Sequence, residues 1–228
     1  MKNSGKTKQS NSASTLVLVL IILNILVPIV FPWLAWPIIK NSINTQWKPI
    51  IYIYPKKDID VEIKLSDPNT LTTTYPKYVD SWNVKALTDG TLIDKSGKKY
   101  YALYWESASN RKNPMKEDGF VVKGEDTASF LEEKLEVLGL NYKESNEFIM
   151  YWLPKLENNK YNYIRFQTMD EINSNMDLDI NPKPDTLIRV RMEYKPLNKK
   201  INVKEQKLIP IERKGYTVVE WGGTNIND

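Results

Sequence analysis

The longest apolar pattern in the chain lies near the N-terminus, at residues 15–39. No charged residue occurs between Gln9 and Ile39, and the stretch is longer than the roughly 20 residues that an α-helix needs to cross a bilayer. Trp33 and Trp36 suit the headgroup boundary at its far end. We therefore predict an uncleaved membrane anchor at 15–39, preceded by a short basic tail at residues 1–14.

A cleaved signal peptide is the alternative interpretation of this segment. Cleavage requires small residues at the last and third-last positions before the cut, and for a cut after Ala35 the third-last position is Trp33. Lys2, Lys6 and Lys8 make the tail positive, which favours a cytoplasmic tail. Several lysines also follow the segment, but charges near a long folded region count for less. We therefore expect a single-pass cell-membrane protein with a cytoplasmic N-terminus and its C-terminal domain outside.

After a polar linker at residues 40–49, period-two alternation predicts β-strands. Apolar residues alternate with charged ones at 59–65 and again at 188–194, the pattern of a half-buried strand. The charged positions Arg189 and Arg191 are interpreted as a solvated strand face. Further strands are predicted at 50–54, 82–87, 91–94, 100–106, 120–123, 164–167 and 216–221.

Two dipeptides place tight turns inside one group of strands. Asp89-Gly90 and Ser96-Gly97 are turn sequences, so residues 82–106 are expected to form a meander of three strands. The last of these strands is nonpolar on both faces until Glu106. We therefore interpret it as a central strand that is covered on both sides and ends near a rim of the sheet.

Helical periodicity appears between the strands. Apolar residues recur every three or four positions at 128–138, which predicts an amphipathic helix. Asp126 is placed to cap its start and Gly139 to end it.

A second helix is expected directly after the first. Asn141 and Glu144 have the spacing of a capping box, and the apolar run at 148–153 predicts deep burial until Pro154 stops or kinks the helix. The pattern as a whole predicts an α+β fold: a mainly antiparallel, sandwich-like β-sheet with an inserted αα-hairpin, forming a single domain at residues 50–228.

Composition narrows the possible chemistry and partners. The chain has no Cys and no His, which excludes disulfides, thiolate zinc sites, imidazole metal ligands and His-dependent triads. We expect no cofactor and no metal.

The net charge of +4 comes mostly from the N-terminal tail. The rest of the chain has balanced charge, so it would gain little binding free energy from contact with nucleic acid. The expected partners are the lipid bilayer, through residues 15–39, and envelope proteins or glycans, with no nucleic acid.

Five blocks of the sequence resemble a family of uncharacterised microbial proteins. The blocks are KPIIYIYPKK (48–57), GFVVKGEDTASFLEEKL (119–135), NEFIMYWLP (146–154), IRFQT (164–168) and VEWGG (219–223). The resemblance covers most of residues 48–223 and leaves out the N-terminal segment. No activity is established for that family, so the resemblance implies a defined fold and no function.

The candidate chemistry rests on carboxylates beside tryptophans. Trp105-Glu106 ends one predicted strand, and Glu220-Trp221 lies in another. Two carboxylates within about 5–9 Å of each other can act as a glycosidase pair. The structural alternative is a core strand that ends in a hydrogen-bonded Glu. Glu106 and Glu220 are therefore candidate catalytic residues, and Trp105 and Trp221 are candidate ligand contacts.

A further candidate lies at the start of the first predicted helix. Residues 123–127 (KGEDT) combine a Lys, a Gly and a helix N-terminus, as in an anion cradle. Glu125 and Asp126 would themselves occupy that positive end, which argues against phosphate there. A cationic or hydroxyl-bearing ligand remains open, with Glu125 as its contact.

The expected function is a membrane-anchored extracytoplasmic binding or structural module. The alternative is an anchored hydrolase that uses Asp and Glu on envelope polymers or glycans. A concave pocket that joins Glu106, Glu220 and Glu125 would support the enzyme. A solid interior there, with an exposed aromatic patch elsewhere, would support the module.

Overall fold

The computed structural model describes residues 48–108 and 114–226, which belong to the compact unit Thr45–Asp228. The predicted tail, the predicted membrane anchor and most of the predicted linker lie outside the described residues. Among the residues that are described, no helix has the length and apolar character to cross a bilayer.

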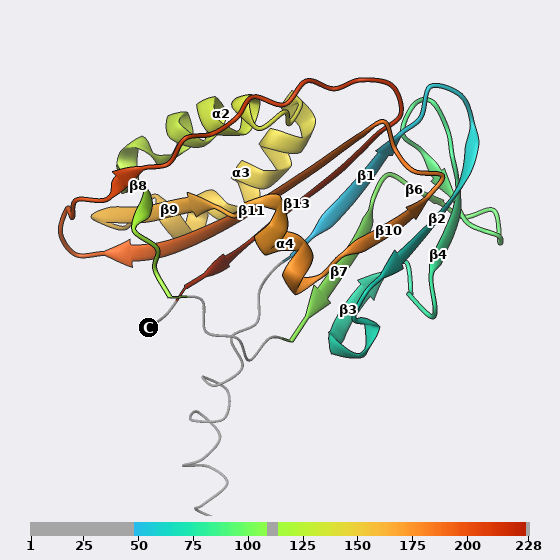
Figure 1. Cartoon of the computed structure of the whole chain (residues 1–228), viewed down its shortest axis with the longest axis horizontal. Coiled ribbons are helices and arrows are strands. Elements are labelled where there is room, and N and C mark those ends of the chain that lie inside the picture. The colour runs from blue at the N-terminus through green and yellow to red at the C-terminus, as the bar shows by residue number, and fades with distance from the viewer. Residues whose placement is uncertain (1–47, 109–113, 227–228) are drawn as a thin grey trace, which may run out of the picture. The chain divides into compact units, whose positions relative to one another are not determined.

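The described residues form two β-sheets, one large and mixed, the other small and antiparallel (Figure 1). The large sheet has the strand order β12-β8-β9-β11-β13-β1-β7-β3, and its parallel pairs are β11 with β13 and β12 with β8. The small sheet has the order β10-β2-β4-β5-β6. The strands of the large sheet are β1 (Ile50–Tyr54), β3 (Leu71–Tyr75), β7 (Leu103–Ser107), β8 (Asp118–Lys123), β9 (Tyr161–Phe166), β11 (Thr186–Leu197), β12 (Lys204–Glu205) and β13 (Thr217–Asn225). Those of the small sheet are β2 (Ile59–Leu65), β4 (Trp82–Ala86), β5 (Leu92–Ile93), β6 (Lys99–Tyr100) and β10 (Leu178–Asn181).

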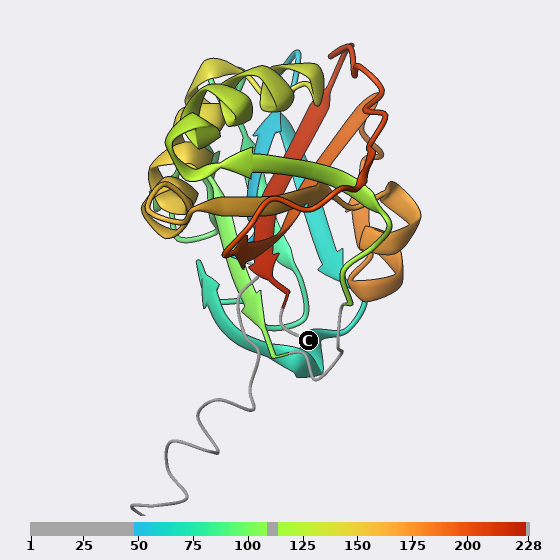
Figure 2. The same ribbon diagram turned by 90° about the vertical axis from the view of Figure 1, so that its left-hand side faces the viewer.

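Two helices, α2 (Thr127–Val137) and α3 (Tyr142–Leu156), cover one face of the large sheet (Figure 2). A short helix, α4 (Met169–Asn175), and two 3-10 turns, η1 (Pro68–Thr70) and η2 (Gly124–Asp126), complete the described elements. The α+β class and the pair of helices predicted from the sequence are confirmed.

The two helices begin and end largely as the sequence predicts. The Asn141 side chain accepts hydrogen bonds from the amides of Lys143 and Glu144, and the Glu144 carboxylate accepts from the Asn141 amide at 2.8 Å. This is the expected capping box. Gly139 follows α2 with φ +87°, a conformation that suits glycine at a helix end.

Two details of the helix ends differ from the prediction. Asp126 makes no capping hydrogen bond with its side chain. Residues 124–126 instead form η2, and the Thr127 hydroxyl donates to the Lys123 carbonyl at 3.0 Å. Helix α3 runs through Pro154 to Leu156. A proline in the last turn removes a single hydrogen bond, and the burial of Leu156 in the core favours continuing the helix past it.

Each face of the large sheet lines its own hydrophobic core. On the helix side, Trp152 of α3 packs in one cluster with Val190 and Trp221 of the sheet. Gly223 on β13 permits this approach, because a Cβ there would lie 2.9 Å from the Trp152 ring. On the other face, residues of β1, β7 and β13 form a second cluster with the small sheet.

The segment at 100–106 departs from the prediction. The meander is confirmed through β4, β5 and β6, but β6 ends at Tyr100 and the chain then enters β7 in the large sheet. Strand β7 lies next to the edge strand β3, and Tyr101 is 66% exposed, so this is not a central strand covered on both sides. An apolar run has the same appearance whether one strand continues or the chain crosses between two sheets that share a core.

The expected deep burial of α3 holds for one side of the helix. Phe148 and Trp152 are fully buried, whereas Met150 is 68% exposed. Helix α3 lies on the surface of the large sheet, so only its inner side is buried. The apolar run at 148–153 extends beyond that side, and part of it faces solvent.

The charged stripe of β11 is not solvated, contrary to the prediction. Arg189, Arg191 and Glu193 are 5%, 2% and 3% exposed. The neighbouring strands carry opposite charges directly across from two of them, with Glu220 opposite Arg189 and Arg165 opposite Glu193. Pairing of these charges is what permits their burial.

Candidate functional site

Two of the predicted site residues, Trp105 and Glu220, meet in the interior of the protein. The Trp105 indole Nε1 donates to Glu220 Oε1 at 3.0 Å, and Arg189 Nε donates to Glu220 Oε2 at 2.6 Å. Trp105 and Glu220 are almost completely buried. Both carboxylate oxygens accept from fixed donors away from solvent, an arrangement that suits a structural group better than a group that contacts a substrate.

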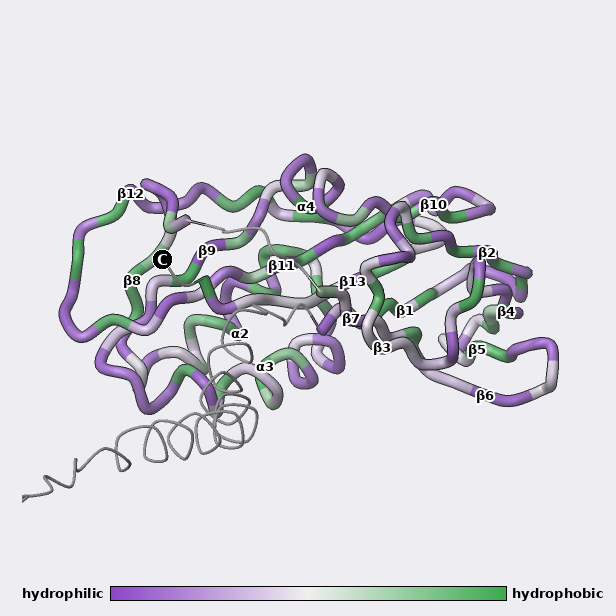
Figure 3. The backbone as a smooth tube through the Cα atoms, turned by 90° about the horizontal axis from the view of Figure 1, so that it is seen from below, coloured by the Kyte–Doolittle hydropathy of each residue, from purple (hydrophilic) through white to green (hydrophobic). Residues whose placement is uncertain are grey.

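Glu220 belongs to a buried ionic cluster that we call the charged face. Its members alternate along β9, β11 and β13 with residues of the helix-side core, so they point to the opposite side of the large sheet. They are Arg165, Arg189, Arg191, Glu193 and Glu220. Figure 3 colours the backbone by hydropathy, and β11, where apolar and charged residues alternate, is labelled there.

One arm of the charged face leads to the surface. Glu193 accepts from Gln167 Nε2 at 2.6 Å and from Arg165 Nη1 at 3.3 Å. Arg165 also donates to Asp118 at 3.0 Å and to Glu171 at 2.9 Å, and the side chains of these two acids are 37% and 31% exposed. Arg165 therefore joins a buried carboxylate to hydrated ones.

The other arm of the charged face binds the α4 segment and packs in the protein interior against the large sheet. Arg189 donates to the Asn173 side chain at 2.7 Å and to the Met176 carbonyl at 2.8 Å. The Arg191 guanidinium lies 5.5 Å from the centre of the Trp105 ring, and its partner on β13 is Gly222, which presents no side chain. Burial lowers the pKa of Arg191 to about 10, and the nearby Glu220 opposes this shift. The charged face is thus a packed structural network.

The remaining predicted residues lie in three separate places. Trp221 is buried in the helix-side core. Glu125 is exposed before α2 and forms an ion pair with Lys123 at 3.1 Å. Glu106 follows Trp105 on β7 and so points to the helix side of the large sheet, the face opposite Glu220. The structure does not bring Glu106, Glu220 and Glu125 into one pocket.

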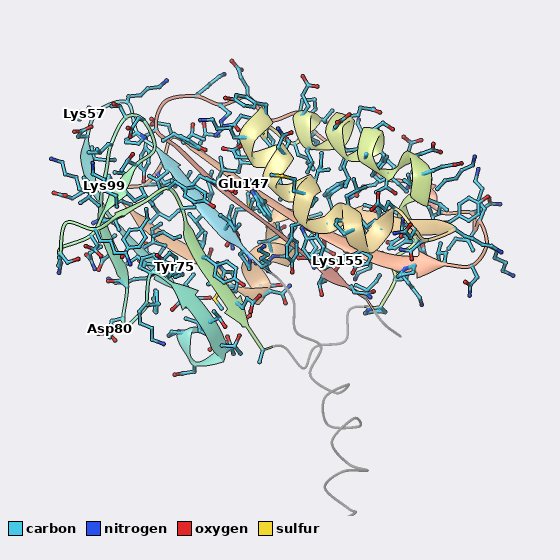
Figure 4. The ribbon with its side chains drawn as sticks, turned by 180° about the vertical axis from the view of Figure 1, so that it is seen from behind. Lys57, Tyr75, Asp80, Lys99, Glu147 and Lys155 are labelled. Carbon is cyan, nitrogen blue, oxygen red and sulfur yellow. The ribbon has the colours of Figure 1, made fainter. Side chains whose placement is uncertain are left out.

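Several tyrosines lie with Glu106 on the helix side of the large sheet: Tyr101 is exposed, Tyr104 and Tyr151 are half-buried, and Tyr52 is buried. Here β1 and β7 extend beyond α3, whose Glu147 and Lys155 are labelled in Figure 4. We call this region the tyrosine surface. It consists of Lys48, Tyr52, Tyr101, Tyr104, Glu106, Glu147, Tyr151 and Lys155.

The β1 side of the tyrosine surface is held by one short hydrogen bond. The Tyr52 hydroxyl donates to Glu147 Oε2 at 2.6 Å, and the Tyr52 and Tyr101 ring centres are 6.4 Å apart. Burial and the hydrogen bond to Glu147 raise the pKa of Tyr52 above its ordinary value. Tyr52 therefore stays a donor at physiological pH, and Tyr101 presents its ring to solvent.

The α3 side brings two lysines to one aromatic ring. Lys48 Nζ and Lys155 Nζ each lie 3.5 Å from the centre of the Tyr151 ring, and Lys155 also donates to the Tyr151 carbonyl at 2.9 Å. Burial lowers the pKa of Lys155, and burial together with the charge of Lys155 lowers that of Lys48. Burial and a hydrogen bond with Glu106 raise the pKa of Tyr104.

Grooves elsewhere on the described residues offer less organised chemistry. One groove, of ≈ 500 Å³, lies on the outer face of the small sheet. Two of its acids are already engaged: Glu62 pairs with Lys64 at 3.1 Å, and Asp94 accepts hydrogen bonds from Ser96 within its own turn. Within residues 48–108 and 114–226, no group of three or more acidic side chains is placed to hold a metal ion.

Most of the tyrosine surface was not among the predicted site residues. Glu106 was, but Tyr151 lies inside the apolar run at 148–153, which indicated core rather than surface. A signal was present on α3, because Glu147, Tyr151 and Lys155 follow one another at intervals of four and so share one side of the helix.

No protein-family model, no curated protein and no solved structure matches this chain. The resemblance of its five sequence blocks to a microbial family stays a prediction.

Proposed function

We propose that the chain is a membrane-anchored binding module whose folded unit binds a polyhydroxylated ligand, such as an envelope glycan, outside the cell. The observation that carries the proposal is the exposed Tyr101 ring beside the Tyr52–Glu147 hydrogen bond. Sugars present apolar C–H faces that pack on aromatic rings and hydroxyls that bind carboxylates. Tyrosine suits such contacts because its ring is large, rigid and amphipathic.

The arrangement of the carboxylates favours a module over the alternative hydrolase. Glu106 and Glu220 lie on opposite faces of the sheet, and Glu220 is locked by Trp105 and Arg189. A solid interior at Glu220 with an exposed aromatic surface elsewhere is the combination expected of a binding module.

The membrane part of the proposal rests on the sequence. Residues 15–39 are uncharged and long enough to span a bilayer, and the basic tail favours an outer location for the folded unit.

The chain is expected to stay in the membrane fraction after high-salt and carbonate washing. Protease added to intact, wall-stripped cells is expected to remove the folded unit and spare residues 1–14. Protection of the folded unit would contradict the orientation, and a new N-terminus near residue 36 would contradict the anchor.

Ligand binding is tested with the neutral saccharide chitotetraose. We expect saturable binding to the full chain by isothermal titration calorimetry, in a detergent that contains neither sugar nor phosphate, such as dodecyl-dimethylamine oxide. Tyr101→Ala is expected to weaken binding about tenfold, which corresponds to about 1.4 kcal/mol. Cellotetraose and muropeptides are compared next, because the proposal fixes the chemical class of ligand rather than one sugar.

Tyr142→Ala is the matched control for this test. Tyr142 is 72% exposed and lies on α3, but it is nine residues before Tyr151 and so points to the opposite side of the helix. Its removal is expected to leave the affinity unchanged. Absence of binding to every saccharide by a folded protein, or equal losses in the two variants, would refute the proposed function. Release of reducing ends that depends on Glu106 would favour the hydrolase instead.

A further inference from the structure

The outer side of α3 carries apolar side chains that the core does not bury. Residues 148–154 contain no charged residue, yet Met150 is 68% exposed. Pro154 is also exposed, and Ile149 and Leu153 are half-buried. We call these four residues the apolar ridge. They are neighbours on the helix surface, because their spacings include three and four residues, and adjoining exposed apolar side chains mark a contact surface.

The neighbouring helix α2 has the opposite character on its outer side. Glu132, Glu133 and Glu136 are exposed there, and no apolar residue of α2 is exposed. Both helices lie over the same face of the large sheet, and both are turned toward the viewer in Figure 4. The core that they cover therefore does not explain the difference between their outer sides. The difference points to a contact that α3 makes and α2 does not.

The chain enters the folded unit beside α3. Lys48, two residues before β1, has its Nζ 3.5 Å from the centre of the Tyr151 ring of α3. Residues 40–47 separate it from the predicted anchor and can extend by at most roughly 30 Å. This linker sequence comes after Ile39 and ends in Trp47, a residue type that favours the headgroup boundary. A bilayer that holds the anchor is therefore within reach of α3.

The size of the apolar ridge favours a bilayer over a soluble protein as its partner. A specific protein interface uses roughly 20–30 residues on each side, and the ridge has only four. A contact that is tethered through the same chain needs little affinity of its own, because the tether keeps the effective concentration high. So small a ridge suffices for a bilayer that already holds the anchor, and it does not suffice for a freely diffusing partner.

We propose that the apolar ridge of α3 docks on the surface of the bilayer that holds the predicted anchor. The inference rests on the proposed function, because it takes residues 15–39 as the anchor, but it requires no saccharide binding. Interfacial helices bury their apolar side chains at the boundary between headgroups and acyl chains. Charged residues bound the ridge at both ends, Lys143 seven residues before Met150 and Glu157 seven residues after it. The contact is therefore confined to the apolar stretch between them.

Docking of the ridge has a consequence for the tyrosine surface. Glu147, Tyr151 and Lys155 of that surface lie along one flank of α3, beside the outer side that Met150 occupies. A folded unit that rests on α3 holds this flank close to the bilayer. The ligand of the tyrosine surface is then bound next to the membrane rather than far out in the envelope.

The test uses the full chain in phosphatidylcholine nanodiscs, with its methionine methyl groups labelled with ¹³C. A phosphatidylcholine with a doxyl spin label in its acyl chain broadens the NMR signals of nuclei close to it. We expect the Met150 signal to lose at least half its intensity. Met169, which is 37% exposed, is the control, because α4 covers the charged face on the other side of the large sheet. Its signal is expected to persist.

High salt and two variants show whether the contact is apolar. Salt screens attraction between charges, so the broadening of Met150 is expected to be the same in 0.5 M sodium chloride. Leu153→Gln is expected to reduce it at least twofold. Val79→Gln changes another exposed apolar residue, between β3 and β4, and is expected to leave it unchanged. An unchanged signal of the buried Met192 shows that the Leu153 variant is folded.

The outcomes separate docking from anchoring. If the chain enters the nanodiscs but Met150 keeps its intensity, or loses it only at low salt, docking is refuted and the anchor stands. If the chain stays outside the nanodiscs, the anchor fails and docking fails with it. A Met150 signal that responds only to a second copy in the same disc would assign the ridge to a dimer and overturn the proposal. Saccharide binding is measured separately and is expected to survive Leu153→Gln.

Discussion

Strands β2 and β11 have nearly the same binary pattern and opposite environments. In both, apolar residues alternate with charged ones. In β2 the charged residues Asp60 and Lys64 face solvent, whereas in β11 Arg189, Arg191 and Glu193 are buried. Alternation therefore identifies a strand and its apolar side, but it does not show what covers the polar side.

The difference arises from the position of each strand in the fold. Strand β2 lies in the small sheet, with its polar side facing outward along the open groove lined by Asp60 and Glu62. Strand β11 lies inside the large sheet between β9 and β13, and α4, with Asn173, and the residue after it, Met176, contribute to covering its polar side. A charged stripe can be buried there because oppositely charged residues of adjacent strands stand in register with it.

The largest effect is expected on the apolar side of β11. Trp152→Ala removes a fully buried ring from the helix-side core and is expected to lower the free energy of unfolding by about 3–5 kcal/mol. Urea unfolding of the full chain, followed by far-ultraviolet circular dichroism, measures it. A loss below about 1 kcal/mol would mean that α3 is peripheral to the fold.

The polar side of β11 is expected to respond almost as strongly. Arg165→Met removes one hydrogen-bond donor from Glu193, which is 3% exposed, while Gln167 still donates to it, and the change is expected to cost about 3 kcal/mol. The matched change on β2 is Lys64→Met. It breaks the pair with Glu62, whose side chain is 33% exposed, and is expected to leave the free energy of unfolding almost unchanged, because water screens an exposed pair. Equal losses in the two variants would remove the distinction between the strands.

The smallest effect is expected at the solvent-facing turn between β5 and β6. Hydrogen bonds from Ser96 and then Tyr100 lower the pKa of Asp94 to about 2. Because the pKa is lowered by folding, this stabilisation is present above the unfolded pKa and is lost as the pH falls toward 2. Ser96→Ala is expected to raise the pKa of Asp94 toward its ordinary value, as measured by NMR titration of its carboxyl carbon. An unchanged pKa would show that the Ser96 hydroxyl does not control it.

Local patterns predicted much of the fold because they are set by neighbours in the chain. The capping box at Asn141 and Glu144 and the glycine end of α2 depend on contacts over a few residues. The crossing from β6 to β7 and the burial of Arg189 depend on tertiary partners. No local pattern distinguishes a solvated arginine from one that faces Glu220, thirty-one positions away.

The candidate site was predicted less well for the same reason. Trp105 was a candidate ligand contact and Glu220 a candidate catalytic residue, but no pattern indicated that the two side chains meet, and their contact is an interior hydrogen bond. The tyrosine surface combines β1, β7 and α3, and it forms because α3 leaves that part of the sheet uncovered. Its lysines could not be placed at one ring from the sequence, because their positions depend on tertiary packing.

The most direct test of the buried charged face is a double-mutant cycle on Arg189 and Glu220. The two residues lie directly opposite each other on β11 and β13, with Nε and Oε2 2.6 Å apart. Unfolding free energies of Arg189→Met, Glu220→Leu and the double variant give the coupling energy of the pair. The account predicts a coupling of about 2–3 kcal/mol, as for buried groups in one network. A coupling below about 0.5 kcal/mol, as for exposed pairs, would contradict it.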